Sequence, residues 1–279
     1  MIGSIIGDIV GSIYEFNNIR TKDFELFGKG AVYTDDSILT LATADALLSG
    51  NLAKITNYYA NYAETNPYPM GGYGDSFKNW VVRKTRTGYA PAYMSCGNGS
   101  AMRVGPVGWA FNTKEDTMKA AKISAEGTHN HPEGIKGAQA TAICIFLARN
   151  GASNEDIQQC MEKDFNYQFP WTVAELQSRY SWDGVDGKGN GAICQDSVPQ
   201  SILCALQATS FEDAIRNAIS IGGDSDTIGC ITGSIAEAIY GVPTDIYQKA
   251  ISYLPDNFQK IVTAFETKYG SGRLAHKKG

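Results

Sequence analysis

The sequence has few charged residues and no basic cluster outside its C-terminal tail. Of its 279 residues, 19% are charged, and 24 lysines and arginines against 29 aspartates and glutamates give a formal net charge of -5. Proteins that bind nucleic acid usually carry a basic face. We therefore expect no nucleic-acid-binding surface, and we expect a polyanionic ligand to be held by metal ions, helix ends and backbone amides.

Long apolar runs, paired cysteines and zinc-ligand spacings are also missing. The apolar start of the chain, residues 1–13, contains Asp8 and lacks the basic residues that open a secretion signal. No segment reaches the roughly 20 apolar residues that span a bilayer, so we expect no membrane partner and a cytoplasmic location. The 6 cysteines form no Cys-x-x-Cys pair and the chain has 3 histidines, which favours free thiols over disulfides or zinc.

Alternating strand patterns are scarce, whereas helical periodicity is frequent. We predict helices, among others, at residues 37–49, 134–149, 211–221, 227–240 and 257–268. The pattern indicates an all-α protein with a single compact multi-helix domain, residues 1–270, followed by a basic tail, residues 271–279.

Several local signals refine this helical interpretation. Gly3, Gly7 and Gly11 recur every fourth residue, which gives the first helix a thin face for close packing. Pro199 is expected at the start of a helix, where its missing N–H is tolerated. Glu15 is expected to end the first helix with a carboxylate.

Two acidic clusters stand directly before predicted helices. The polar residues of these clusters are Thr34, Asp35, Asp36, Asp224, Asp226 and Thr227. One such residue is enough to cap a helix, yet each cluster supplies two aspartates and a hydroxyl. Gathered carboxylates repel one another unless a cation lies among them, and their oxygens suit magnesium or manganese. Simple capping stays an alternative, because the sequence does not show that the two clusters meet.

Three other stretches are candidates for binding. Glu15, at the expected end of the first helix, could equally be a solvated helix end. The glycine-rich stretch at residues 95–103 could hold phosphate or ribose oxygens with its amides, although it matches neither the P-loop nor the dinucleotide motif. His129 lies in a polar stretch before a predicted helix and is expected to hydrogen-bond a substrate or a loop. No Gly-x-Ser-x-Gly motif supports a serine hydrolase.

Taken together, these stretches resemble the motifs of the ADP-ribosylglycohydrolase family, in order along the chain. The matching stretches are GDIVGSIYE at 7–15, TDDS at 34–37, GYGDS at 72–76, GNGSAMRV at 97–104, THNHPEG at 128–134, DSVPQSI at 196–202 and GGDSDTIG at 222–229. The resemblance covers roughly residues 1–241. It implies an all-α fold with two magnesium or manganese ions between the two acidic clusters.

The resemblance also implies roles for individual residues. The implied metal ligands are Thr34, Asp35, Asp36, Asp224, Asp226 and Thr227. The implied catalytic candidates are Glu15, which corresponds to the family's mobile glutamate, together with Asp35 and Asp226. The implied contacts to ADP-ribose are Tyr73, Gly74, Ser95, Gly97, Asn98, Gly99 and His129.

The implied reaction is hydrolysis of the glycosidic bond between ADP-ribose and an acceptor, on a modified protein or a small ADP-ribosyl compound. The ribose hydroxyls would face the metals, and the transition state would have oxocarbenium character. The stretch around His129 looks closer to arginine-specific members, and the stretch ending at Glu15 equally resembles serine-specific ones, so we favour arginine slightly. The alternatives are a non-catalytic ADP-ribose-binding module and a metal-dependent hydrolase of another phosphorylated small molecule. We expect a monomer.

Overall fold

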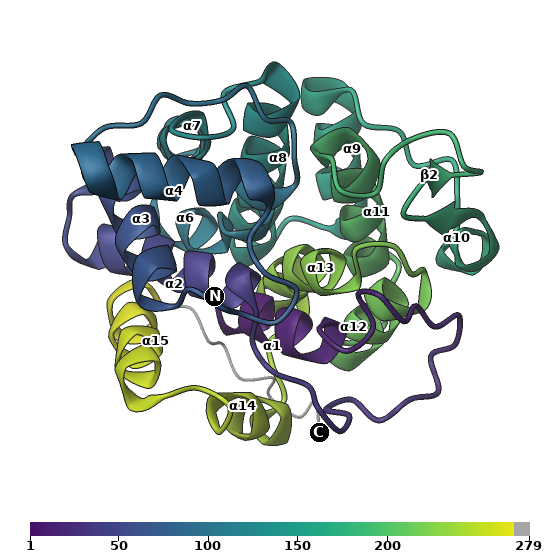
Figure 1. Ribbon diagram of the computed structural model, residues 1–279. Helices are drawn as coiled ribbons and strands as arrows, with labels where there is room; N and C mark the ends of the chain where they lie inside the picture. The colour runs from purple at the N-terminus through teal and green to yellow at the C-terminus, as the bar shows by residue number, and fades with distance from the viewer. Residues whose placement is uncertain (271–279) are drawn as a thin grey trace.

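The computed structural model describes residues 1–270, and over this range the chain is built almost entirely of helices (Figure 1). In chain order the elements are α1 (Ile2–Gly11), α2 (Asp35–Leu48), the 3-10 turn η1 (Leu52–Lys54), α3 (Ile55–Thr65), α4 (Asp75–Thr87), α5 (Gly99–Met102), α6 (Gly105–Ala110), α7 (Lys114–Glu126), α8 (Pro132–Arg149), α9 (Asn154–Phe165), α10 (Val173–Arg179), β1 (Tyr180–Ser181), β2 (Gly184–Val185), α11 (Cys194–Leu206), α12 (Phe211–Ser220), α13 (Ser225–Tyr240), α14 (Thr244–Ile251) and α15 (Asp256–Tyr269). The all-α prediction is confirmed. The basic tail predicted at residues 271–279 lies outside the described residues.

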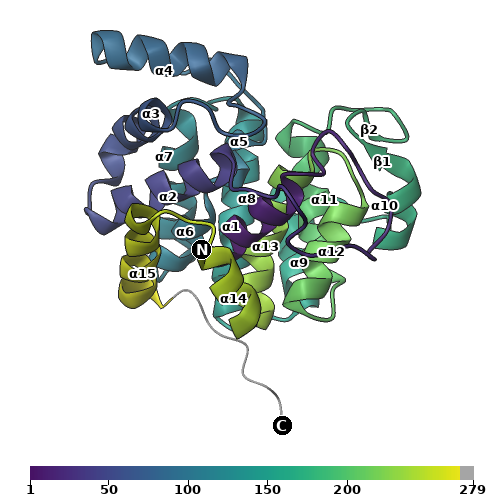
Figure 2. The same ribbon diagram turned by 60° about the horizontal axis from the view of Figure 1, so that its bottom comes forward.

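Helices α1 and α13 form the centre of the molecule, with other helices around them (Figures 1 and 2). Helix α13 packs against α1, α8, α11 and α12, whereas α2, α12 and α14 also contact α1. Every residue of α1 is buried, so this helix is apolar almost all round. The first and the thirteenth helix are remote in the chain, and their contact places the ends of both helices side by side.

Glycines make this central contact possible. A Cβ added to Gly7 would lie 1.9 Å from the carbonyl oxygen of Gly229, and one added to Gly3 would lie 2.1 Å from that of Gly233. A Cβ added to Gly11 would lie 2.4 Å from the Cα of Asp226. The predicted thin face of the first helix is therefore confirmed, and its partner is a second row of glycines on α13.

Two local predictions need correction. Pro199 does not begin a helix but lies inside α11, which starts five residues earlier at Cys194. The proline lacks the N–H that would bond to the carbonyl of Gln195, and buried packing of α11 against α8 and α13 outweighs this loss. Helix α1 ends at Gly11, so Glu15 lies beyond it, in the loop that leads to α2.

The remaining features agree with the sequence. All six cysteines are free, as predicted, and β1 and β2 form only a two-stranded antiparallel hairpin. Thr113 and Ser153 cap α7 and α9. Among the described residues, no helix is both long and apolar enough to cross a membrane.

Candidate active site

A cavity of about 410 Å³ opens where the N-termini of α2 and α13 meet the glycine-rich turn before α5. Of the residues predicted for the site, those lining this cavity are Glu15, Tyr73, Gly74, Asp35, Asp36, Ser95, Gly97, Asn98, Gly99, His129, Asp224, Asp226 and Thr227. Thr34 is fully buried and does not line it. The fold thus gathers the two acidic clusters, the glycine-rich turn and the histidine stretch around one space.

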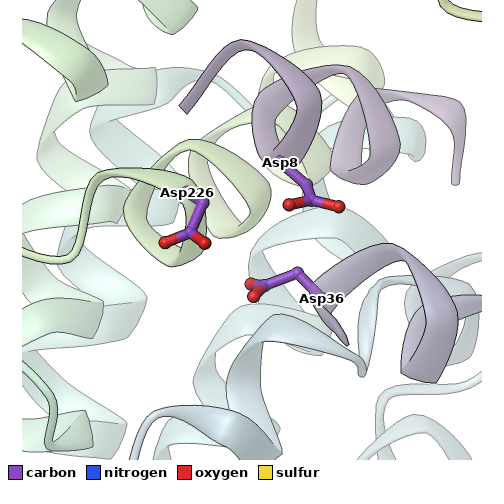
Figure 3. A group of neighbouring side chains, drawn as sticks. All are labelled: Asp8, Asp36 and Asp226. Atoms are coloured by element: carbon purple, nitrogen blue, oxygen red, sulfur yellow. The ribbon is translucent and has the colours of Figure 1, made fainter. Parts of the chain in front are cut away.

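Acidic side chains from three helices converge at one side of the cavity. Figure 3 shows Asp8 of α1, Asp36 of α2 and Asp226 of α13 with their carboxylates turned toward a common space. One oxygen from each of these carboxylates lies within 4.8 Å of the others. Glu15, Asp224 and Asp226 form a second such group, so Asp226 belongs to both.

Asp8 joins α1 to the first turn of α2. Its Oδ2 accepts the backbone N–H groups of Thr34 at 2.8 Å and Ser37 at 3.1 Å, and also the Ser37 hydroxyl. Its Oδ1 accepts the Thr34 hydroxyl at 2.6 Å. A carboxylate has about four acceptor sites, so Asp8 is largely saturated within the protein and mainly fixes the start of α2.

The other carboxylates keep more of their acceptor capacity. Asp36 Oδ1 and Glu15 Oε2 are buried without a hydrogen-bond partner. Asp224 accepts the amide of Asn98 at 2.8 Å, and Asp226 accepts the backbone N–H of Thr227 at 2.9 Å. Thr227 also donates its hydroxyl to Asp36 at 3.3 Å.

Burial and mutual repulsion raise the pKa values of this acidic group. Burial, followed by neighbouring carboxylates, raises the pKa of Asp35, Asp36 and Asp226 well above the usual range. Burial, with the charges of Asp224 and Asp8, raises the pKa of Glu15 to about 7. Burial also raises the pKa of Asp8 to about 6, against the opposing effect of its hydrogen bonds. Protons or cations must therefore neutralise part of this charge.

The donor set fits divalent metal ions with hard ligands. Carboxylates and a threonine hydroxyl supply only oxygen, and the unpartnered oxygens of Asp36 and Glu15 have room for a further interaction. Oxygen ligands of this kind suit magnesium or manganese rather than zinc. The residues present are thus consistent with a cation among them.

The loop that carries Glu15 is tied to the turn before α13. Asn18 donates its amide to the carbonyl of Gly223 at 2.9 Å and accepts the N–H of Gly223 at 2.8 Å. Gly222 and Gly223 have φ values of +72° and +76°, which side-chain-bearing residues rarely adopt. Trp182 donates its ring N–H to the carbonyl of Glu15 at 3.1 Å.

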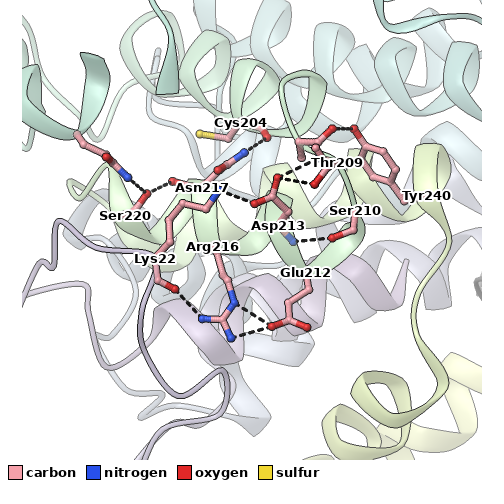
Figure 4. A network of polar contacts seen from close by, with 12 residues as sticks. Lys22, Cys204, Thr209, Ser210, Glu212, Asp213, Arg216, Asn217, Ser220 and Tyr240 are labelled. Carbon is pink, nitrogen blue, oxygen red and sulfur yellow. Dashed lines mark hydrogen bonds and ion pairs between the residues drawn. The ribbon is translucent and has the colours of Figure 1, made fainter. Parts of the chain in front are cut away.

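Farther along, the same loop is anchored to α12 (Figure 4). Lys22 pairs with Asp213, and Arg216 donates to the carbonyls of Lys22 and Phe24, each at 2.8 Å. These contacts fix the loop at Lys22 and Phe24, on the C-terminal side of Glu15.

Other parts of the cavity lining carry mainly backbone and neutral groups. Gly97 and Gly99 leave the Nε2 atom of His129 uncovered, because a Cβ on Gly99 would lie 3.1 Å from it. Tyr73 is buried and donates its hydroxyl to the carbonyl of Asn66 at 2.9 Å. Arg103 also lines the cavity, so a basic side chain stands beside the backbone amides of the glycine-rich turn.

Comparison with known proteins identifies the protein family. The sequence model of the ADP-ribosylglycohydrolase family matches residues 1–269. The chain belongs to the ADP-ribosylglycohydrolase family. ADP-ribosylhydrolase ARH3 of Mus musculus is 27% identical over 95% of this chain and 87% of its own length. ADP-ribosylarginine hydrolase Tri1 of Pseudomonas putida is 24% identical over 87% of this chain and 70% of its own length.

A solved structure supports the fold. A chain described as an ADP-ribosylglycohydrolase-related protein complex superposes with a TM-score of 0.70, at 20% identity, over 96% of this chain and 95% of that one. This family membership accounts for the order of the seven matching stretches along the chain. One of them, residues 196–202, lies apart from the cavity, and Asp196 there accepts the N–H of Asn190 at 2.7 Å.

Asp8 and Trp182 are among the residues of the site that the sequence did not predict. In the sequence Asp8 stands out only as a charged residue within an apolar run. An acidic residue inside an otherwise apolar helix was the available signal, because every residue of that helix is buried. Trp182 lines the cavity from the β1–β2 hairpin, and nothing in its local sequence pointed there.

Proposed function

We propose that this chain is a divalent-metal-dependent hydrolase that cleaves the glycosidic bond between ADP-ribose and a modified acceptor. The observation that carries the proposal is the convergence of two carboxylate groups, sharing Asp226, at a cavity that is also lined by the glycine-rich turn. The named activities of ARH3 and Tri1, which align over most of this chain, support the same reaction class.

We further propose that two magnesium or manganese ions are held by Asp35, Asp36, Asp224, Asp226 and Thr227. Such ions, when bound, would orient the ribose hydroxyls and stabilise developing negative charge. Thr34 completes the set predicted from the sequence, although its hydroxyl is engaged with Asp8. The assignment of the two ions rests on the oxygen-only donor set.

The chain's own residues suit the remaining tasks. Glu15 Oε2 has no hydrogen-bond partner, and the pKa of Glu15, raised to about 7 by burial and by Asp224 and Asp8, allows it to hold or release a proton near neutrality. Asn98 holds Asp224 through a 2.8 Å hydrogen bond. The amides around Gly97 and Gly99 would face the phosphate and ribose oxygens, and Tyr73, Gly74 and Ser95 also line the cavity.

For the acceptor we propose arginine. Phe16 stacks on Trp182 with ring centroids 6.2 Å apart, directly beside Glu15, and Phe16 is 71% exposed. A planar guanidinium is attracted to aromatic faces and to surrounding carboxylates. Release assays on arginine-linked and serine-linked ADP-ribose test this part, and faster release from serine would contradict it.

The central proposal is tested by removing one shared ligand. Asp226→Asn, which preserves shape, is expected to lose turnover of ADP-ribosylated protein by about 100-fold or more. Asp256→Asn, on the exposed start of α15, is the matched control and should keep full turnover. EDTA should abolish wild-type activity, and magnesium or manganese should restore it.

The alternatives give different results in the same assays. ADP-ribose binding without release from any modified protein would point to a binding module. Turnover of simple phosphate esters without release of ADP-ribose would point to a different hydrolase. Full activity in EDTA would reject the metal role.

A further inference from the structure

A buried arginine lines the cavity together with His129. Arg103 is 1% exposed, and its guanidinium carbon lies 4.0 Å from the centre of the Tyr59 ring. Its Nη2 donates to the hydroxyl of Thr128 at 2.7 Å and to the carbonyl of Ser124 at 3.2 Å. Burying a charge costs free energy unless it is hydrogen-bonded. The two neutral acceptors hold Nη2, whereas Nε and Nη1 are buried without a hydrogen-bond partner.

Thr128 connects this arginine to the histidine. Its Oγ1 lies 2.7 Å from Nδ1 of His129 and accepts from Arg103, which can only donate. The threonine proton can therefore go to Nδ1 at 2.7 Å, to the carbonyl of Ala125 at 3.5 Å, or to the side chain of Tyr93, which also hydrogen-bonds Thr128. That carbonyl already accepts the N–H groups of Thr128 at 3.1 Å and His129 at 2.8 Å, so the short contact to Nδ1 is favoured.

This direction of donation fixes the tautomer of His129. A neutral imidazole that accepts at Nδ1 carries its proton on Nε2. Burial, and secondly the charge of Arg103, lowers the pKa of His129 well below its usual range, which keeps the ring neutral. The Nε2 atom faces Gly97 and Gly99, where an added Cβ would lie 3.6 Å and 3.1 Å from it.

We propose that Arg103 and Thr128 are positioning residues that lock His129 as an Nε2–H donor into the cavity. The ligand atom that meets this donor must then be an acceptor oxygen, such as a phosphate or hydroxyl oxygen of a nucleotide. The identity of the ligand rests on the proposed function, whereas the tautomer rests only on the contacts of the three residues.

The tautomer can be measured directly in the wild-type protein with magnesium present. The chain has 3 histidines, so long-range proton–nitrogen NMR spectra of nitrogen-15-histidine-labelled protein are simple, and loss of one set of signals in His129→Gln assigns them. We expect an unprotonated nitrogen shift at Nδ1 and a protonated one at Nε2 of His129. A protonated Nδ1, or averaged shifts from two tautomers, would overturn the inference.

Variants separate positioning from a merely structural role. Thr128→Val removes the hydroxyl, and it should give averaged His129 nitrogen shifts and weaken ADP-ribose binding about tenfold in calorimetry. Thr128→Ser keeps the hydroxyl and should restore both the Nε2–H signature and the affinity. Arg103→Met removes the donor to the hydroxyl oxygen of Thr128 and should also give His129 nitrogen shifts averaged over two tautomers. Unchanged His129 shifts in this variant would contradict the role given to Arg103.

The outcomes distinguish this inference from the proposed function. If wild-type protein does not bind ADP-ribose, the proposed function fails, yet the nitrogen shifts of His129 still decide the tautomer. If ADP-ribose binds and Thr128→Val keeps both wild-type affinity and a locked Nε2–H, the positioning role is wrong. If a variant does not fold, the wild-type spectrum alone remains decisive.

Discussion

The contact between α1 and α13 offers a quantitative test through a single methyl group. In Gly7→Ala, the new Cβ would lie 1.9 Å from the carbonyl oxygen of Gly229, whereas ordinary contacts begin at 3.4 Å. The two helices must therefore separate by about 1.5 Å, the difference between these values. Neither neighbour is a flexible side chain that could rotate away, because all the close atoms are backbone.

The magnitude follows from opposing effects. Alanine is a better helix former than glycine by about 1 kcal/mol. Overpacking a core costs about 1–3 kcal/mol and occasionally more. Because every residue of α1 is buried, a displaced α1 also loses packing along its whole length. We expect Gly7→Ala to lower the free energy of unfolding by about 3 kcal/mol.

Urea denaturation gives the assay. The midpoint should fall at an unchanged slope, since the surface exposed on unfolding stays similar. Gly74→Ala is the control for stability, because Gly74 has φ of -58° and no atom lies within 4 Å of its added Cβ. Asp8 and Asp226 flank the same contact, so turnover of Gly7→Ala should also fall, by roughly 100-fold. If Gly7→Ala unfolded at the same urea midpoint as wild type, the close packing of α1 against α13 would be refuted.

Two further predictions concern residues that do not line the cavity, Glu266 and Arg216. Burial, together with the charge of Glu237, raises the pKa of Glu266 to about 7 despite its hydrogen bond from Tyr247. The folded protein therefore binds more protons than the unfolded chain between about pH 4.5 and pH 7, and wild type loses stability as pH rises through that window. The free energy of unfolding of Glu266→Gln should consequently exceed that of wild type by about 1 kcal/mol at pH 8, after allowance for solvent screening, and by little at pH 4. Urea titrations at both pH values measure this difference, and a difference independent of pH would contradict the prediction. Arg216→Met removes the donor to the carbonyls of Lys22 and Phe24 and should speed proteolysis of the Glu15 loop. The control Arg83→Met, on the exposed face of α4, should leave the cleavage rate unchanged. Equal cleavage rates for the two variants would show that this anchor is not needed.

Local signals in the sequence predicted the helices better than the contacts between them. Thr113, Ser153 and Ser210 cap helices, and such capping depends only on a few neighbouring residues. The spacing of glycines predicted a thin face on α1. It could not show that this face meets α13, since that choice depends on contacts between remote parts of the chain. Pro199 misled for the same reason, because packing of α11 overrides a local preference.

The same limit applies to the site, where hydrogen bonding separates residues that look alike in the sequence. Asp8 and Asp36 are both buried acids of one carboxylate group, yet Asp8 accepts four hydrogen bonds from Thr34 and Ser37 while Asp36 Oδ1 accepts none. Asp8 therefore has little capacity left for an external partner, whereas Asp36 has an open position. Replacing Asp8 by Asn would turn one acceptor into a donor facing the donors of α2 and should cost stability as well as turnover. Asp36→Asn should cost mainly turnover, so the ratio of these two losses distinguishes an acid that shapes the site from one that acts in it.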